Sequence, residues 1–74
     1  MKATEATREI MKEQGVGVSK LADRLNIKPN VTSERLRQQN ISVSKLNEIL
    51  RVLDYKIVLA PREATVPKGG YEIE

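Results

Sequence analysis

Hydrogen-bonding side chains are concentrated between residues 28 and 38, where Asn30, Ser33, Glu34 and Arg37 follow one another closely. Amide, hydroxyl, carboxylate and guanidinium groups can match a pattern of donors and acceptors on a partner without any covalent step. The chain has no histidine and no cysteine, so it lacks an imidazole base, a thiol nucleophile and the usual zinc ligands. We therefore expect recognition rather than catalysis: a non-enzyme with no metal and no cofactor.

Positive charge is concentrated in the same part of the chain. The net charge is +3. Residues 15–40 carry this excess, because their basic side chains outnumber the two acidic ones, Asp23 and Glu34. The basic residues are Lys20, Arg24, Lys28, Arg35 and Arg37. A local excess of this kind is typical of an anion-binding surface, and the alternative is an ordinary solvated basic face.

The length and composition predict one small domain. The chain has 74 residues, of which 39% are hydrophobic and 3% aromatic, so a core must be built from aliphatic side chains, which helices use well. We expect a single domain over residues 1–60 and a flexible tail over residues 61–74. No apolar run approaches the roughly 18 to 20 residues of a membrane span, and the N-terminus has no apolar signal segment, so the expected location is cytoplasmic.

Apolar spacing and capping residues predict four helices. The first runs from Thr4, its expected N-cap, to Gln14, and the second from Val18 to Leu25 with Gly17 before it and Asn26 after it. The third starts at Pro29 and ends near Gln38 or Gln39, and the fourth follows a Ser42 cap and ends near Leu53. The expected inward residues of the third helix are Val31, Thr32 and Leu36; those of the fourth are Val43, Leu46, Ile49, Leu50 and Leu53.

A β-strand is expected after the fourth helix. Residues 55–60 are rich in β-forming side chains and are followed by Pro61. A lone strand of this length is not stable in water, so it needs a partner. We expect the same strand of a second copy, giving a homodimer through Tyr55, Ile57, Val58 and Leu59; the weaker alternative is pairing with residues 71–73.

The second and third helices are joined by a three- to four-residue turn, which is the arrangement of a helix-turn-helix. Its first helix needs a small residue at the crossing, supplied by Ala22, and apolar anchors, supplied by Leu21 and Leu25. Its turn needs an inward hydrophobe, supplied by Ile27. With Leu21-Ala22 and Leu25-Asn26-Ile27, the stretch from Val18 to Arg37 resembles the helix-turn-helix of the phage repressor and Cro-like family, also called the Xre family.

The resemblance implies a mainly α fold: a four-helix Cro/repressor-like helix-turn-helix domain with a C-terminal β-strand used for dimerisation. The sequence departs from the family pattern at several positions. Val18 stands where the family usually has Gln, Asn26 where it has Gly, and Thr32 where it has a large hydrophobe. The last inward anchor is Leu36, whereas in the family it falls near Arg35, and a strand takes the place of the family's fifth helix.

The resemblance also implies site residues. The positions that face the DNA major groove in the family correspond to Lys28, Pro29, Asn30, Val31 and Glu34, and Ser33 and Arg37 lie along the same side. Asn can pair with adenine, Glu can accept from cytosine, and Val can touch a thymine methyl. The expected phosphate contacts are Ser19, Lys20, Arg24 and Arg35. For each of these residues the alternative is ordinary solvation or helix capping.

The sequence therefore predicts a sequence-specific DNA-binding transcriptional regulator that acts as a repressor. As a homodimer, it would bind a near-palindromic operator in double-stranded DNA through its third helix. The alternative is a protein-interaction or antitoxin-like module, in which the helix-turn-helix is a scaffold and the C-terminal tail binds a protein partner.

Overall fold

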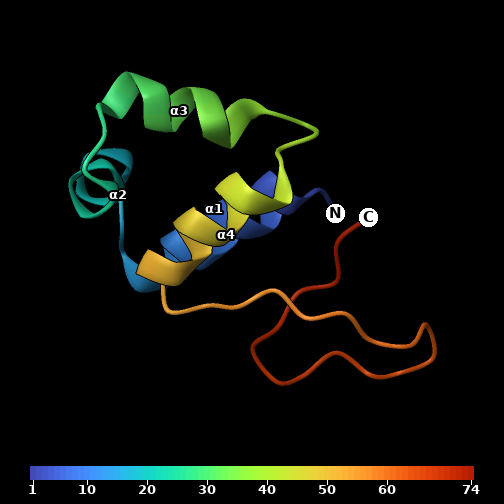
Figure 1. The fold of residues 1–74 in the computed structure, drawn as a ribbon. Coiled ribbons are helices and arrows are strands. Elements are labelled where there is room, and N and C mark those ends of the chain that lie inside the picture. The colour runs from blue at the N-terminus through green and yellow to red at the C-terminus, as the bar shows by residue number, and fades with distance from the viewer.

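The computed structural model describes all 74 residues and contains four α-helices and no β-strand. The helices are α1 (Ala3–Gln14), α2 (Val18–Leu25), α3 (Pro29–Arg37) and α4 (Val43–Val52). Figure 1 shows α1 and α4 side by side, with α3 on one side of this pair, α2 at one end, and the C-terminal segment on the other side. The mainly α class is therefore confirmed.

The predicted turn residues end and begin the helices as expected. Gly15 ends α1 and Asn26 ends α2, both in the left-handed conformation, with φ of 68° and 57°. Glycine has no Cβ to clash in this region, and asparagine tolerates it better than most residues. Pro29 is in the first turn of α3, and the Ser42 hydroxyl accepts a hydrogen bond from the Lys45 N–H at 3.2 Å. These local signals are the reason why α1 and α2 end, and α3 and α4 begin, where the sequence predicted.

The predicted start of α1 is wrong. Its N-cap is Lys2, and the Glu5 carboxylate accepts a hydrogen bond from the Lys2 N–H at 2.7 Å, which extends the helix toward the N-terminus. Thr4 is inside the helix and only 4% exposed. Its hydroxyl donates to the backbone oxygen of Gln38 at 3.0 Å, so it serves a tertiary contact and not a cap.

The core is aliphatic and α4 supplies much of it. The buried cluster consists of Ile10, Met11, Val16, Leu21, Leu36, Leu46, Ile49, Leu50 and Leu53. Two expected core residues are not in it: Val43 is 69% exposed and Val31 is 39% exposed. On α3, Thr32 and Leu36 are four residues apart and occupy the inward stripe, which turns Val31 outward. Val43 is the first residue of α4, three residues before the first buried one, Leu46.

The predicted β-strand is absent. The Tyr55 N–H donates to the Leu50 oxygen at 2.8 Å, but residues 56–60 make no backbone–backbone hydrogen bond, and residues 71–73 do not pair with them. A strand exists only as one member of a ladder, and a single copy of the chain supplies no second member here. Tyr55 and Ile57 instead pack partly buried against the core, while Val58 and Leu59 are exposed.

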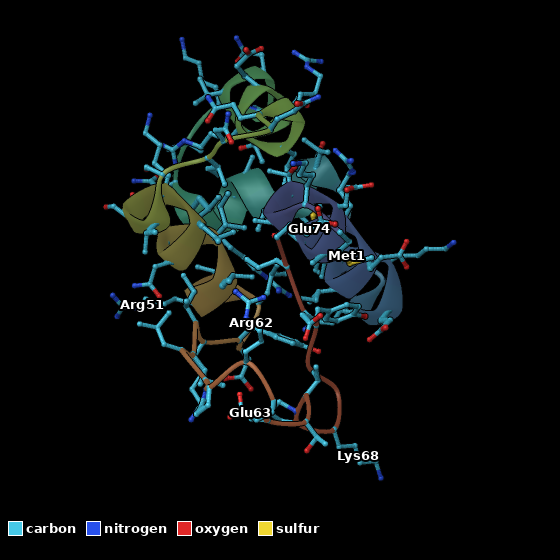
Figure 2. The ribbon with its side chains drawn as sticks, turned by 90° about the vertical axis from the view of Figure 1, so that its right-hand side faces the viewer. Met1, Arg51, Arg62, Glu63, Lys68 and Glu74 are labelled. Carbon is cyan, nitrogen blue, oxygen red and sulfur yellow. The ribbon has the colours of Figure 1, made fainter.

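The C-terminal segment, residues 61–74, has no helix or strand, and its end returns to α1, so that the two termini are adjacent (Figures 1 and 2). The Glu74 N–H donates to the Met1 oxygen at 3.0 Å, and the Tyr55 hydroxyl donates to the Gly69 oxygen at 3.0 Å. The Tyr71 hydroxyl donates to the Glu13 carboxylate, and this bond raises the pKa of Tyr71 to about 12. No helix of the chain has the length and apolar character needed to cross a membrane.

The position of Leu50 in the core gives a test of the packing. Leu50→Ala removes a side chain that is 8% exposed, and we expect it to lower the free energy of unfolding by about 2 to 5 kcal/mol through the cavity that it leaves. Val43→Ala is the matched control, because it truncates an aliphatic residue of the same helix that faces solvent. Urea unfolding followed by circular dichroism compares the two. Similar losses in both variants would contradict this core.

Candidate nucleic-acid interface

A short turn joins α2 to α3 next to buried residues of α2. Leu21 and Ala22 of α2 are 0% and 1% exposed, and the Ile27 N–H donates to the Ala22 oxygen at 3.1 Å. The small side chain of Ala22 allows the two helices to approach closely, and Ile27 is half-buried in the turn between them. Leu21 and Ala22 are therefore buried as predicted, and Leu25 packs partly buried against the core. Ile27, the predicted inward residue of the turn, is only half-buried and is not among the residues that pack against the core.

The far end of α3 is held by side chains of α1. A helix leaves its last carbonyl groups without partners in the helix. At the end of α3, the Leu36 oxygen accepts from Nη1 of Arg8 at 2.6 Å, and the Gln38 oxygen accepts from the Thr4 hydroxyl at 3.0 Å. Both ends of α3 are thus fixed to the body of the domain. Sequence reasoning missed this role of Thr4 and Arg8, and their spacing of four residues on one face of α1 is the signal that could have found it.

The inward side of α3 is narrow. Thr32 is fully buried although it is polar, and its hydroxyl donates to the Lys28 oxygen one turn earlier at 3.2 Å. This bond satisfies the hydroxyl inside the helix, so the side chain can be buried where the resembling family has a larger hydrophobe. Leu36 is the second inward residue, at 4% exposed. With so little of its surface buried, α3 presents most of its side chains to solvent.

The outward side of α3 carries the residues predicted to contact bases. Asn30, Val31, Glu34 and Arg37 are exposed, as are Lys28 and Pro29 at the start of the helix, while Ser33 is half-buried. A shallow hollow of about 490 Å³ lies between α3 and the first turn of α4. It is lined by Asn30, Val31, Glu34, Arg35, Arg37, Gln38 and Lys45. Lys45 comes from the next helix, and only the tertiary arrangement brings it to this surface.

The residues predicted to contact phosphates are of two kinds. Ser19, Lys20 and Arg24 of α2 are exposed. Nη1 of Arg24 donates a hydrogen bond to the Val52 oxygen at 3.5 Å. The N-cap of α2 is Gly17, which has no side chain to cap the first N–H groups of the helix, so these groups are open to an anion near Ser19.

Arg35 differs from the other predicted phosphate contacts. Its side chain is only 18% exposed, and Nη1 lies 3.9 Å from Oε1 of Glu48 on α4. The same Nη1 atom is buried and makes no hydrogen bond. Arg35 therefore belongs to the contact between α3 and α4, which leaves less of it available to a phosphate than the sequence suggested.

The chain has no cluster of acidic, histidine or cysteine side chains that could hold a metal ion. No protein-family model, no curated protein and no solved structure matches the chain significantly. The resemblance to the Xre family thus rests on the residues quoted from the sequence.

The Thr4 contact gives a test of how α3 is held. Thr4→Val keeps the shape of the side chain but leaves the Gln38 oxygen without its donor, so we expect the free energy of unfolding to fall by about 1 to 2 kcal/mol. Thr7→Val is the control: Thr7 is equally buried, but its hydroxyl bonds only within α1, to the Ala3 oxygen. We expect a change of no more than about 0.5 kcal/mol for it in urea unfolding. A loss for Thr7→Val as large as that for Thr4→Val would count against a specific role of the α1–α3 contact.

Proposed function

We propose that this protein is a sequence-specific DNA-binding regulator that inserts α3 into the major groove and represses transcription by occupying its operator. The observation that carries the proposal is the outward side of α3, which presents an amide, a carboxylate and a guanidinium to solvent from a helix anchored at both ends. Side chains of these types read base edges in the major groove. The basic excess of residues 15–40 supplies the attraction to phosphates.

The place of each residue on α2, α3 or α4 decides whether we assign it to a base or to a phosphate. Asn30, Val31, Glu34 and Arg37 are assigned to base edges, with Lys28, Pro29 and Ser33 beside them. Ser19, Lys20 and Arg24 are assigned to phosphates, and Lys45 joins them from α4. Base contacts specify the sequence, whereas phosphate contacts position the protein on the duplex.

We further propose that the protein binds as a homodimer through residues 56–60. Their backbone N–H and C=O groups make no backbone–backbone bond within the chain, and Leu59 is 97% exposed. Antiparallel pairing with the same segment of a second copy would satisfy these groups about a two-fold axis. Tyr55 and Ile57 would stay against their own core, so Val58 and Leu59 are the side chains that remain available to the partner. Two copies of α3 about 34 Å apart would then read a near-palindromic operator.

A protein-interaction or antitoxin-like module is the second candidate. The observation in its favour is the set of exposed apolar residues after α4, namely Val58, Leu59, Val66 and Ile73. Selection of bound duplexes from a random DNA pool separates the two candidates. Recovery of a near-palindromic sequence supports the operator-binding dimer, and recovery of no preferred sequence contradicts it.

The base and phosphate roles predict different losses. We expect Asn30→Ala to cost about 1 to 3 kcal/mol on the selected duplex and to relax the preference at one position. We expect Lys20→Ala to weaken binding to all sequences alike and to lower the salt dependence by about one unit. Binding titrations on selected and scrambled duplexes at several salt concentrations measure both effects. Equal losses on the two duplexes in both variants would refute the assigned base reading.

The dimer is tested by removing one ladder donor. Val58→Pro deletes an N–H that makes no backbone bond within the chain, so the folded monomer should keep its thermal stability. We expect analytical ultracentrifugation to show a dimer for the wild type and a monomer for the variant, with much weaker binding to the operator. A Val58→Pro protein that remains dimeric and binds normally would exclude pairing through this segment.

A further inference from the structure

The hollow between α3 and α4 has one carboxylate among cationic groups in its lining. The cationic residues in this lining are Arg35, Arg37 and Lys45, and Glu34 is the single acid. Oε2 of Glu34 accepts a hydrogen bond from Nη2 of Arg37 at 2.8 Å. The two side chains are 66% and 68% exposed, so a duplex docked on α3 would meet this ion pair directly.

The ion pair opposes binding to DNA of arbitrary sequence. A carboxylate facing a duplex is repelled by the phosphates, and it also holds the guanidinium of Arg37, which cannot neutralise a phosphate while it is paired. An exposed pair of this kind adds little to the stability of the fold. Glu34 at this position therefore lowers the affinity for DNA and adds little to the stability of the fold.

One base pair fits both members of the ion pair together. In the major groove, cytosine presents its N4 amino group as a donor, and guanine presents O6 and N7 as two adjacent acceptors. Within a C·G pair, cytosine N4 and guanine O6 lie next to each other. In the protein, the Glu34 carboxylate and the Arg37 guanidinium are likewise neighbours. A carboxylate can accept from N4 while a guanidinium donates to O6 and N7 in its two-pronged geometry. A T·A pair offers no two adjacent acceptors on one base, so it satisfies the guanidinium less well.

We propose that Glu34 determines specificity: the Glu34–Arg37 pair reads one C·G base pair as a unit, and the carboxylate penalises duplexes that lack it at that position. This inference rests on the proposed DNA-binding function and deepens it. Sequence selectivity here comes partly from a repulsive group, because Glu34 lowers the affinity for non-matching DNA more than it raises the affinity for the matching site.

The test is duplex selection and binding with Glu34→Gln, Arg37→Gln and a matched control, Glu63→Gln. Glu63 is exposed in the C-terminal segment, which lies on the opposite side of the molecule from α3 (Figures 1 and 2), and its substitution changes the net charge by the same amount. All three residues are exposed, so thermal melting should be unchanged. We expect the wild type to select C·G at one position of each half-site.

Glu34→Gln is expected to reduce the C·G preference about tenfold, which corresponds to the loss of one good base contact. It should also bind random duplex more tightly, with a salt dependence steeper by about one unit because Arg37 is released to a phosphate. Arg37→Gln should lose the same preference but bind random duplex more weakly. Glu63→Gln should behave as the wild type.

Two results would overturn the inference while leaving DNA binding intact. One is an unchanged C·G preference and salt dependence in Glu34→Gln, and the other is an equal gain in random-duplex affinity for Glu34→Gln and Glu63→Gln, which would reduce the effect to net charge. A wild-type protein that selects no sequence would instead refute the proposed function, and the inference with it.

Discussion

The arrangement of this small domain depends on the side chains of α1 that satisfy the carbonyl groups at the ends of α3 and α4. Thr4 and Arg8 donate to the last carbonyls of α3, and Gln14 donates through Nε2 to the Leu53 oxygen at the end of α4 at 2.8 Å. Unpaired carbonyls in part-buried positions are costly, so these bonds fix the ends of two helices that also pack against Ile10 and Met11 of α1 in the core. The consequence is that α3 can be polar over most of its surface and still be held in one position.

This constraint explains how a thin hydrophobic stripe is sufficient on α3. Thr32 and Leu36 are its two buried residues, and Thr32 satisfies its own hydroxyl through the Lys28 oxygen. The other side of the helix is then free to carry an amide, a carboxylate and a guanidinium. In the proposed function these groups face the major groove, and the Glu34–Arg37 pair adds selection against non-matching DNA to the attraction supplied by the basic residues.

The chain after α4 shows the opposite situation, in which backbone groups have no partner within the molecule. Tyr55 and Ile57 pack against the core. The end of the chain returns to the N-terminal region, where Tyr71 bonds to Glu13 of α1 and Glu74 bonds to Met1. Residues 56–60, however, form no backbone–backbone hydrogen bonds. Such a segment is open to pairing with another chain. The proposed dimer uses this opening, and a protein partner for the C-terminal segment would use the same exposed apolar residues.

The sequence by itself determined where α2, α3 and α4 begin and the turns before them, but not where α1 begins. Gly15, Asn26 and Ser42 act within a few residues of their own position, so the ends of α1 and α2 and the start of α4 are as predicted. The period of α4 identified Leu46, Ile49 and Leu50 as core residues, although it also included Val43, which is exposed. The exposed polar residues of α3 were predictable for the same reason, because local periodicity defines which side of a helix is apolar.

Only the tertiary structure decided the features that depend on distant residues. Thr4 reads locally as a cap, yet it bonds to Gln38; Arg35 reads as a free cation, yet it lies against Glu48; and Lys45 joins the surface of α3 from another helix. The strand prediction was wrong for the same physical reason. β-Propensity describes a residue that suits a ladder, but the ladder forms only when a second backbone lies beside it, and the single chain places none there.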